Sequence, residues 1–334
     1  MATCQTEVSI EGFDIIRLTN ACMSVSIMPQ LGGKIYELVD LRTGRDWLWK
    51  NPYIPLRHPQ PDLDYEKELD SGGWDEILFS VKPCILELAD GQNLLFGDHG
   101  SVVDRDWQNL EAGVNDKGDA TCELVVEGQA PHFRLSRRIV LNAEQARLDI
   151  EYKLTNTGTS PWPWLWCAHP LLAIEEGMMI NVPNGQQIRT DPFNPLCSHD
   201  RGMEQTWPLL ASPEGGLINL AAIFDRSTAP ETFCAKLFVE SSEEVSVSTA
   251  NGNESLSIMY KPEEIPWLGF WINKNGWSGC GSEPYLNLGL EPATSPHDTL
   301  TQAVAYGECT VLEAGMTTQW SLTVYLNHRV NRHD

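Results

Sequence analysis

Apolar and polar residues alternate with a period of two along most of this chain. Such alternation, together with short apolar runs, is typical of half-buried and fully buried β-strands. Asn-Gly and Gly-Gly pairs, which favour turns, separate many of these segments. Few long windows hold a helical period. The pattern predicts a mainly antiparallel β protein, a large sandwich or barrel. The clearest predicted strands are 24–28, 122–126, 133–141, 147–154, 236–239, 245–249, 255–260, 267–272 and 318–326.

The chain has 334 residues, of which 42% are apolar, enough for a sizeable core. No linker, low-complexity tract, charge block or repeat interrupts it. The simplest organisation is one domain over 1–334. We expect the proline-dotted stretch 55–61 and the acidic stretch 62–70 to form surface loops that lead into Ser71-Gly-Gly-Trp-Asp-Glu76.

Acidic residues outnumber basic ones, 46 against 23, and the net charge is −23. Such a chain repels nucleic acid and anionic membrane surfaces, and it disfavours phosphorylated substrates unless cations converge locally. The expected partner is therefore a neutral, polar small molecule. Nothing in the pattern indicates an oligomeric state.

The cysteines indicate a reducing compartment. There are nine, scattered along the chain without a Cys-x-x-Cys pair, as reduced and mostly buried thiols would be. The first residues lack the pattern of a signal peptide, and no run approaches the roughly 18–20 apolar residues of a membrane helix. We expect a cytoplasmic protein.

Two titratable residues end apolar strands and stand directly before proline. One segment reads Trp162-Pro-Trp-Leu-Trp-Cys-Ala-His-Pro170, and the other reads Tyr285-Leu-Asn-Leu-Gly-Leu-Glu-Pro292. Proline disfavours the helical region for the residue before it, so His169 and Glu291 should be extended. An apolar floor can tune their pKa values toward neutrality. We predict a general acid/base pair; the alternatives are a hydrogen-bonded core histidine and a structural salt bridge.

Three further features are compatible with binding of a sugar. The twelve tryptophans include several clusters, and indole rings stack on the C–H faces of sugars, although tryptophan is more often a core residue. His99 lies beside glycine in a turn, where its ring either enters a cleft or stays an ordinary surface group. Asp75 and Glu76 follow Trp74 and either bind hydroxyl groups or belong to a solvated loop.

Metal chemistry is conceivable but not favoured. Two histidines and a carboxylate can ligate a divalent ion, so His99, His169 and Glu291 form a possible set. Nothing in their spacing favours it, and no nucleotide-binding, hydrolase or zinc-protease motif is present. We therefore expect neither a metal nor an organic cofactor.

Four segments, in order along the chain, resemble the aldose 1-epimerase (galactose mutarotase) superfamily. Each motif is weak alone, but the ordered set is fairly specific and spans roughly residues 10–327. They are a glycine pair with a hairpin and a Leu-Trp end over 29–49, Asp98-His-Gly100, Leu154-Thr-Asn-Thr-Gly158 followed by His169-Pro170, and Gly289-Leu-Glu-Pro292 followed by Pro296-His-Asp298.

The resemblance implies an antiparallel β-supersandwich with an open cleft on one sheet. It also implies an acid/base ring opening that interconverts sugar anomers without a cofactor. By motif match, Glu291 would be the general base and His169 the general acid. His99 would hold the sugar near its ring oxygen or anomeric hydroxyl.

The chain departs from the family pattern at two places, as a divergent branch would. The family's Asn-Arg pair ahead of the His-Gly segment is missing, so Asp75 and Glu76, beside Trp74, are expected to take the sugar-binding role. The family's substrate-binding aspartate has no clear counterpart, and Trp271 and Asn273 are the nearest candidates. The identity of the sugar therefore stays open.

Two other functions fit the same scaffold. One is an epimerase for a modified or phosphorylated sugar, which would need cations such as Arg105, Arg134 or Arg137 near the site. The other is a carbohydrate-binding protein without catalysis, which would need the aromatic platform but not the acid/base pair.

Overall fold

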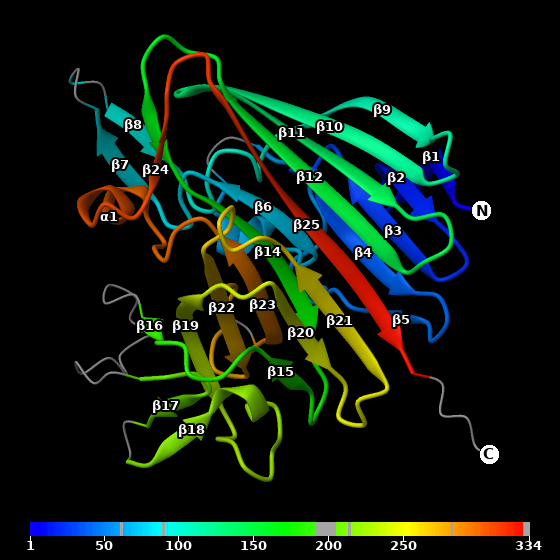
Figure 1. Ribbon diagram of the computed structural model, residues 1–334, viewed down its shortest axis with the longest axis vertical. Coiled ribbons are helices and arrows are strands. Elements are labelled where there is room, and N and C mark those ends of the chain that lie inside the picture. Colours follow the sequence, from blue (N-terminus) through cyan, green and yellow to red (C-terminus); the bar gives the residue numbers. More distant parts are fainter. Residues whose placement is uncertain are drawn as a thin grey trace.

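Two large antiparallel sheets make up most of the computed structural model (Figure 1). The structure describes residues 1–60, 63–88, 91, 93–190, 205–212, 215–281 and 283–329. The first sheet has eleven strands in the order β1-β2-β3-β4-β6-β14-β23-β22-β19-β16, with β5 beside β4. Their bounds are β1 (Thr3–Ile10), β2 (Phe13–Thr19), β3 (Met23–Met28), β4 (Lys34–Asp40), β5 (Arg45–Asp46), β6 (Trp74–Leu78), β14 (Trp166–Ala173), β16 (Arg189–Thr190), β19 (Phe233–Glu240), β22 (Trp267–Lys274) and β23 (Leu286–Ala293).

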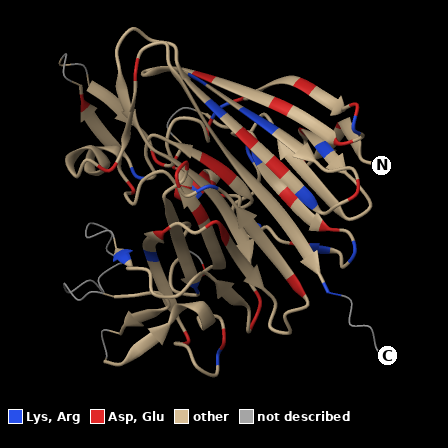
Figure 2. Ribbon diagram, in the orientation of Figure 1, with Lys and Arg blue, Asp and Glu red and all other residues tan. Residues whose placement is uncertain are grey.

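The second sheet has eight strands in the order β15-β20-β21-β25-β12-β11-β10-β9. Their bounds are β9 (Gln108–Val114), β10 (Ala120–Gln129), β11 (His132–Leu141), β12 (Arg147–Asn156), β15 (Met179–Asn181), β20 (Glu244–Ser248), β21 (Glu254–Met259) and β25 (Thr317–His328). In β11, β12 and β25 every second residue is buried, as the period of two predicts. Figure 2 shows acidic and basic residues interspersed along β10, β11 and β12, which marks the other face of this sheet as solvated.

Short elements complete the described part of the chain. Three two-stranded sheets pair β13 (Trp162–Trp164) with β24 (Thr310–Leu312), β7 (Cys84–Glu87) with β8 (Asn93–Phe96), and β17 (Leu209–Ala211) with β18 (Leu217–Asn219). The helical pieces are α1 (Leu300–Ala305), the single π-helical turn η1 (Tyr65–Leu69) and the 3₁₀ turn η3 (Leu220–Ala222). No helix in the described residues is long and apolar enough to cross a membrane.

The core lies between the two large sheets and contains a buried ion pair. Arg137 of β11 and Glu76 of β6 come from different sheets, are both fully buried, and meet at 2.9 Å. Tyr152 and the Trp166 indole also donate hydrogen bonds to Glu76. A buried charge is tolerated only when it is paired and hydrogen-bonded, so this cluster fixes how the two sheets face each other.

The predicted strands are confirmed, since each lies within an observed strand or extends one residue beyond it. The prediction of surface loop over 62–70 is wrong where the structure describes this stretch, while Asp62 lies outside the described residues. Tyr65 and Leu69 of η1 are buried, and so is Asp70. The π-turn directs these side chains inward, although the stretch is acidic, because charged residues occupy its outer face.

Candidate active site

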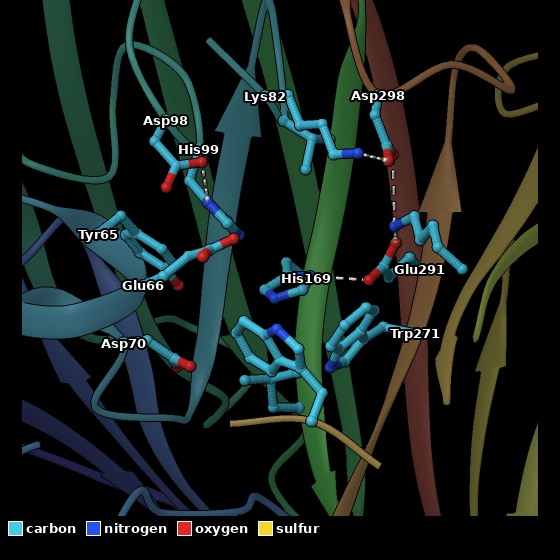
Figure 3. A pocket seen from close by; sticks show the side chains of 14 residues that line it. Tyr65, Glu66, Asp70, Lys82, Asp98, His99, His169, Trp271, Glu291 and Asp298 are labelled. Atoms are coloured by element: carbon cyan, nitrogen blue, oxygen red, sulfur yellow. Dashed lines mark hydrogen bonds and ion pairs between the residues drawn. The ribbon is translucent and has the colours of Figure 1, made fainter. Parts of the chain in front are cut away.

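A pocket, here called the site pocket, opens on the face of the eleven-stranded sheet that points away from the eight-stranded sheet (Figure 3). Four neighbouring strands supply its floor: His169 and Leu171 from β14, Glu291 from β23, Trp271 from β22 and Lys236 from β19. Loops and the η1 segment form its walls. Segments far apart in the sequence therefore meet at one place in the centre of the sheet.

His169 and Glu291 are brought together by strand register. Antiparallel pairing of β14 with β23 joins Leu171 to Gly289 and Cys167 to Ala293, so His169 lies opposite Glu291. Their side chains meet at 2.9 Å between His169 Nδ1 and Glu291 Oε1. The expectation that both residues end their strands is wrong, because both lie inside strands that continue past the proline.

Two glycines make room for the Glu291 carboxylate. A Cβ atom at position 289 would lie 2.6 Å from Glu291 Oε1, and one at position 269 would lie 3.0 Å from Glu291 Oε2. The first contact is shorter than real Cβ contacts, and the second would require the carboxylate to shift. Gly269 and Gly289 therefore hold no side chain because the carboxylate occupies that space.

Lys236 binds the other oxygen of Glu291. Its ammonium group contacts Glu291 Oε2, and both side chains are almost completely buried. Burial by itself would raise the pKa of Glu291, but the charges of Lys236 and His169 outweigh it and lower the pKa to about 2. The expectation that this carboxyl group titrates near neutrality is thus wrong. A lone lysine in an apolar strand was the signal that could have identified Lys236.

His99 enters the pocket from a strained turn. Its backbone has a positive φ of 57°, and Gly100 follows with φ 85°. Its Nδ1 lies 2.9 Å from Asp98 Oδ1, and its ring stacks on Tyr65 at 3.7 Å between centroids. The rings of His99 and His169 stand 5.4 Å apart at 67°. Burial lowers the pKa of His99, but the hydrogen bond and charge of Asp98 more than compensate, so the net pKa is raised.

Two lysines and Asp298 occupy the side of the pocket next to Glu291. Lys236 Nζ lies 3.8 Å from Asp298 Oδ1, and Lys82 Nζ lies 3.9 Å from Asp298 Oδ2. Asp298 is buried and belongs to the Pro-His-Asp segment that the family resemblance singled out. It balances the positive charge that Lys82 and Lys236 would otherwise concentrate here.

The structure does not bring Trp74, Asp75 and Glu76 into the site pocket. β6 is fully buried, and its alternation turns Trp74 and Glu76 into the core between the sheets. Asp75 faces the other way but is 2% exposed, and Lys34 and the Tyr65 hydroxyl cover it at 2.7 and 2.6 Å. The expected sugar contacts are therefore replaced by structural ones.

Trp271 lines the pocket, whereas Asn273 does not. The Asn273 side chain is buried and caps a turn, accepting hydrogen bonds from the backbone N–H groups of Gly276 and Trp277. That turn carries Trp277, whose ring lines the pocket and meets Trp271 edge-on at 5.3 Å. Trp162, Trp164 and Trp166 of β13 and β14 are buried in the core and do not bind a ligand at the pocket, which agrees with the interpretation of tryptophan as a core residue.

Sequence reasoning missed most of the pocket walls. Tyr65, Glu66 and Asp70 come from the segment predicted as surface loop, and burial raises the pKa of the two carboxyl groups. Asp98 adjoins His99 in the chain and could have been paired with it from the sequence. The η1 residues offered no such signal, because only the fold turns them toward the sheet.

Neither a metal-binding cluster of the described residues nor any of the arginines considered for a phosphate lies at the site pocket. Within the described residues, no group of three or more His, Cys, Asp or Glu side chains is arranged to hold a metal ion. The arginines considered for a phosphate lie elsewhere. Arg137 binds Glu76 in the core, and Arg105 and Arg134 both bind Glu127.

Comparison with known proteins gives a match at the level of structure. No family model and no curated protein sequence matches the chain. A solved structure from Klebsiella pneumoniae, described as a candidate aldose 1-epimerase, has a TM-score of 0.71 and 14% identity, and the match covers 97% of this chain and 83% of that one. A galactose mutarotase-like protein from Clostridium acetobutylicum has a TM-score of 0.68 and 14% identity, with 98% of each chain covered.

A third solved structure is the galactose mutarotase related enzyme from Lactobacillus acidophilus. It has a TM-score of 0.61 and 13% identity, and the match covers 95% of this chain and all of that one. All three likenesses extend over nearly the whole chain at low identity. The chain therefore has the galactose-mutarotase-like fold, an antiparallel arrangement of large β-sheets.

Proposed function

We propose that this chain interconverts the α and β anomers of a free sugar by acid/base ring opening in the site pocket, as an aldose 1-epimerase does. The observation that carries the proposal is the 2.9 Å contact between His169 and Glu291 on the pocket floor, made across 122 positions of sequence. A carboxylate and an imidazole joined in this way commonly manage protons in enzymes.

The pocket walls suit a neutral, hydroxyl-rich ligand. Trp271 and Trp277 offer apolar faces for the C–H groups of a sugar ring, and Glu66, Asp70 and Asp98 offer oxygens for its hydroxyl groups. These carboxylates would repel a phosphorylated sugar. We therefore keep an unmodified sugar as the substrate class.

Ring opening needs one group to accept the anomeric proton and another to protonate the ring oxygen. Each well-placed group of this kind contributes roughly 10²- to 10⁴-fold to the rate. The assignment based on the sequence makes Glu291 the acceptor and His169 the donor.

Polarimetry on freshly dissolved α-glucose and α-galactose, followed by a wider panel of sugars, tests the proposal. We expect the protein to accelerate the decay of optical rotation, and we expect the variant His169→Asn to lose most of that acceleration. His132→Asn, an exposed histidine of β11 on the opposite sheet, is the matched control and should retain it.

Two outcomes would contradict an epimerase. Binding of sugars without acceleration would assign the chain to the non-catalytic carbohydrate-binding proteins. Full activity of His169→Asn on the preferred sugar would show that the pair on the pocket floor does not carry the chemistry.

A further inference from the structure

We infer that Glu291 is a positioning residue and not a proton carrier, and that protons in the site pocket move through the outer nitrogens of two histidines, His169 and His99. This inference rests on the proposed function and changes the roles within it. Four observations carry it, each from the described contacts.

The first observation is that Glu291 has no free oxygen. Oε1 is bonded to His169 Nδ1, and Oε2 is bonded to Lys236, with the Cys167 thiol a further 3.8 Å contact. The side chain is 0% exposed. A substrate hydroxyl would have to displace one of these partners to reach the carboxylate, and breaking a buried ion pair is costly.

The second observation is the fixed charge of this carboxylate. Lys236 is almost fully buried beside Glu291 and Asp298, and the pKa of Glu291 is lowered to about 2 after the opposing effect of burial. A carboxylate with so low a pKa is a poor general base toward a sugar hydroxyl at neutral pH, because efficient general bases have pKa values near the working pH. An ionised Glu291 is instead well suited to anchor a histidine.

The third observation is that the two histidines are held alike. His169 Nδ1 lies 2.9 Å from Glu291, and His99 Nδ1 lies 2.9 Å from Asp98. A carboxylate at Nδ1 fixes the neutral tautomer with its proton there and leaves Nε2 for chemistry. Neither Nε2 has a hydrogen-bond partner among the described residues, and both rings line the same pocket 5.4 Å apart.

The fourth observation is the different charge around each ring, which assigns their roles. Four carboxylates surround His99, whereas the carboxylate bonded to His169, Glu291, also binds the Lys236 cation, so the field at His99 favours a bound proton and His99 is the acid. The groups that face His99 are Asp98 of its own loop, Glu66 and Asp70 of the η1 segment, Asp75 of β6, His169 of β14 and the Tyr65 ring. The acidic groups beside His169, which is the base, are Glu291, Asp75 opposite it on β6 and, at longer range, Asp70.

The proton and electron balance of ring opening is then complete. His169 Nε2 takes the proton of the anomeric hydroxyl, and the electron pair of that O–H bond becomes the second bond of the C1 carbonyl. The bond between C1 and the ring oxygen breaks, and its electron pair stays on the ring oxygen, which receives the Nε2 proton of His99. After rotation of the aldehyde, closure reverses both transfers and restores each histidine.

Nuclear magnetic resonance tests the proton roles without depending on any substrate. The protein is labelled with ¹³C at glutamate carboxyl groups and with ¹⁵N in histidine rings. The Glu291 signal is assigned with the paired variant Glu291→Gln/Lys236→Met, which removes both buried charges together, and the His99 signals with His99→Gln. We expect the Glu291 carboxyl shift to stay constant from about pH 9 to about pH 4 while the ¹⁵N shifts of the His99 ring change. A Glu291 shift that titrates in this range would overturn the inference.

The pH dependence of kcat/KM for mutarotation of whichever test sugar is accelerated gives a second test. We expect an acid-side fall in the range where imidazoles titrate, roughly pH 6 to 7, and a loss of about 100-fold or more in His99→Gln. In Glu291→Gln/Lys236→Met the acid-side fall should move to lower pH, because the lost carboxylate contacts the His169 ring directly, whereas the lost ammonium group contacts the other carboxylate oxygen.

The results separate the inference from the proposed function. An active wild type whose kcat/KM stays flat down to about pH 3, or whose His99→Gln variant changes only KM, would overturn the inference and leave the epimerase intact. No acceleration of any sugar would overturn the epimerase, while the resonance experiment would still decide which group holds the protons.

Discussion

At the scale of single residues, the site pocket depends on groups that contact Glu291. Its carboxylate is fixed by an imidazole, by an ammonium group and by two glycines that leave space for it. Each of these contacts can be removed by one substitution. The consequences differ, because one substitution acts on geometry and another acts on charge.

Gly289→Ala should displace the carboxylate without unfolding the protein. The new methyl group would lie 2.6 Å from Glu291 Oε1 and 2.9 Å from the Trp271 Cβ. Displacement of a catalytic constellation by about 1 Å costs roughly 100-fold in rate, so we expect a loss of that order in kcat/KM measured by polarimetry. Gly113→Ala in β9, where an added Cβ meets nothing within 4 Å, is the control. Equal activity of the two variants would show that the carboxylate position does not matter.

The stability of the protein should depend on pH through Glu291. Its folded pKa, about 2, lies below the ordinary value of 4.5, so its stabilising effect is complete above about pH 4.5 and is lost as the pH falls toward 2. At roughly 1.4 kcal/mol for each pH unit, the effect is worth roughly 3 kcal/mol. Chemical denaturation between pH 7 and pH 3 measures it.

Lys236→Met should remove this dependence and destabilise the fold by about 3–5 kcal/mol, because it leaves a buried carboxylate without its cation. Addition of Glu291→Gln should restore part of the stability. If the single variant were as acid-sensitive and as stable as the wild type, the ion pair would not hold Glu291 in its low-pKa state.

At the scale of elements, the site pocket arises where four strands of one sheet meet a short π-helical turn. β14, β23, β22 and β19 provide the floor, and η1 provides the wall that supports His99. The η1 turn is tied to the sheet through the Tyr65 hydroxyl, which donates to Asp75 of β6.

Two substitutions of Tyr65 distinguish the effect of its hydrogen bond to Asp75 from the effect of its stacking on His99. Tyr65→Phe keeps the ring against His99 but removes a hydrogen bond to a buried carboxylate, so we expect a stability loss of about 1.5–3 kcal/mol with kcat/KM nearly unchanged. Tyr65→Ala also removes the ring, and kcat/KM should fall by about 10- to 100-fold. Equal kcat/KM in the two variants would mean that the stacking does not position His99.

At the scale of the whole molecule, the two large sheets are joined by a packed core that contains the Arg137–Glu76 pair. This pair lies on the core side of β6, whereas the site pocket lies on the opposite face. Global stability and the chemistry of the pocket can therefore be altered separately.

Arg137→Met should destabilise the whole fold by about 3–5 kcal/mol, since it leaves the buried Glu76 carboxyl group without its cation. The double variant Arg137→Met/Glu76→Leu should recover much of this lost stability, because apolar side chains of similar volume can replace a buried ion pair without a large loss of stability. Denaturant unfolding measures both variants. If the single variant were as stable as the wild type, the pair would contribute nothing to sheet packing.

The sequence by itself determined nine of the strands and the mainly antiparallel β class, because alternation of apolar residues is a local signal that survives in any sheet with one solvated face. Four ordered motifs indicated the family likeness. It also indicated His169 and Glu291, since a titratable residue in an apolar strand must be paired or used. The single domain over 1–334 stays a prediction.

Only the tertiary structure decided what these residues contact. Trp74, Asp75 and Glu76 are adjacent in the sequence, yet the alternation of β6 sends them to different faces, and none reaches the pocket. Lys236, Tyr65 and Asp298 come from three distant segments, and no local pattern joins them to Glu291 or His99. The contacts and the pKa of each of these side chains depend on residues from neighbouring strands, and the order of the strands is a property of the whole fold.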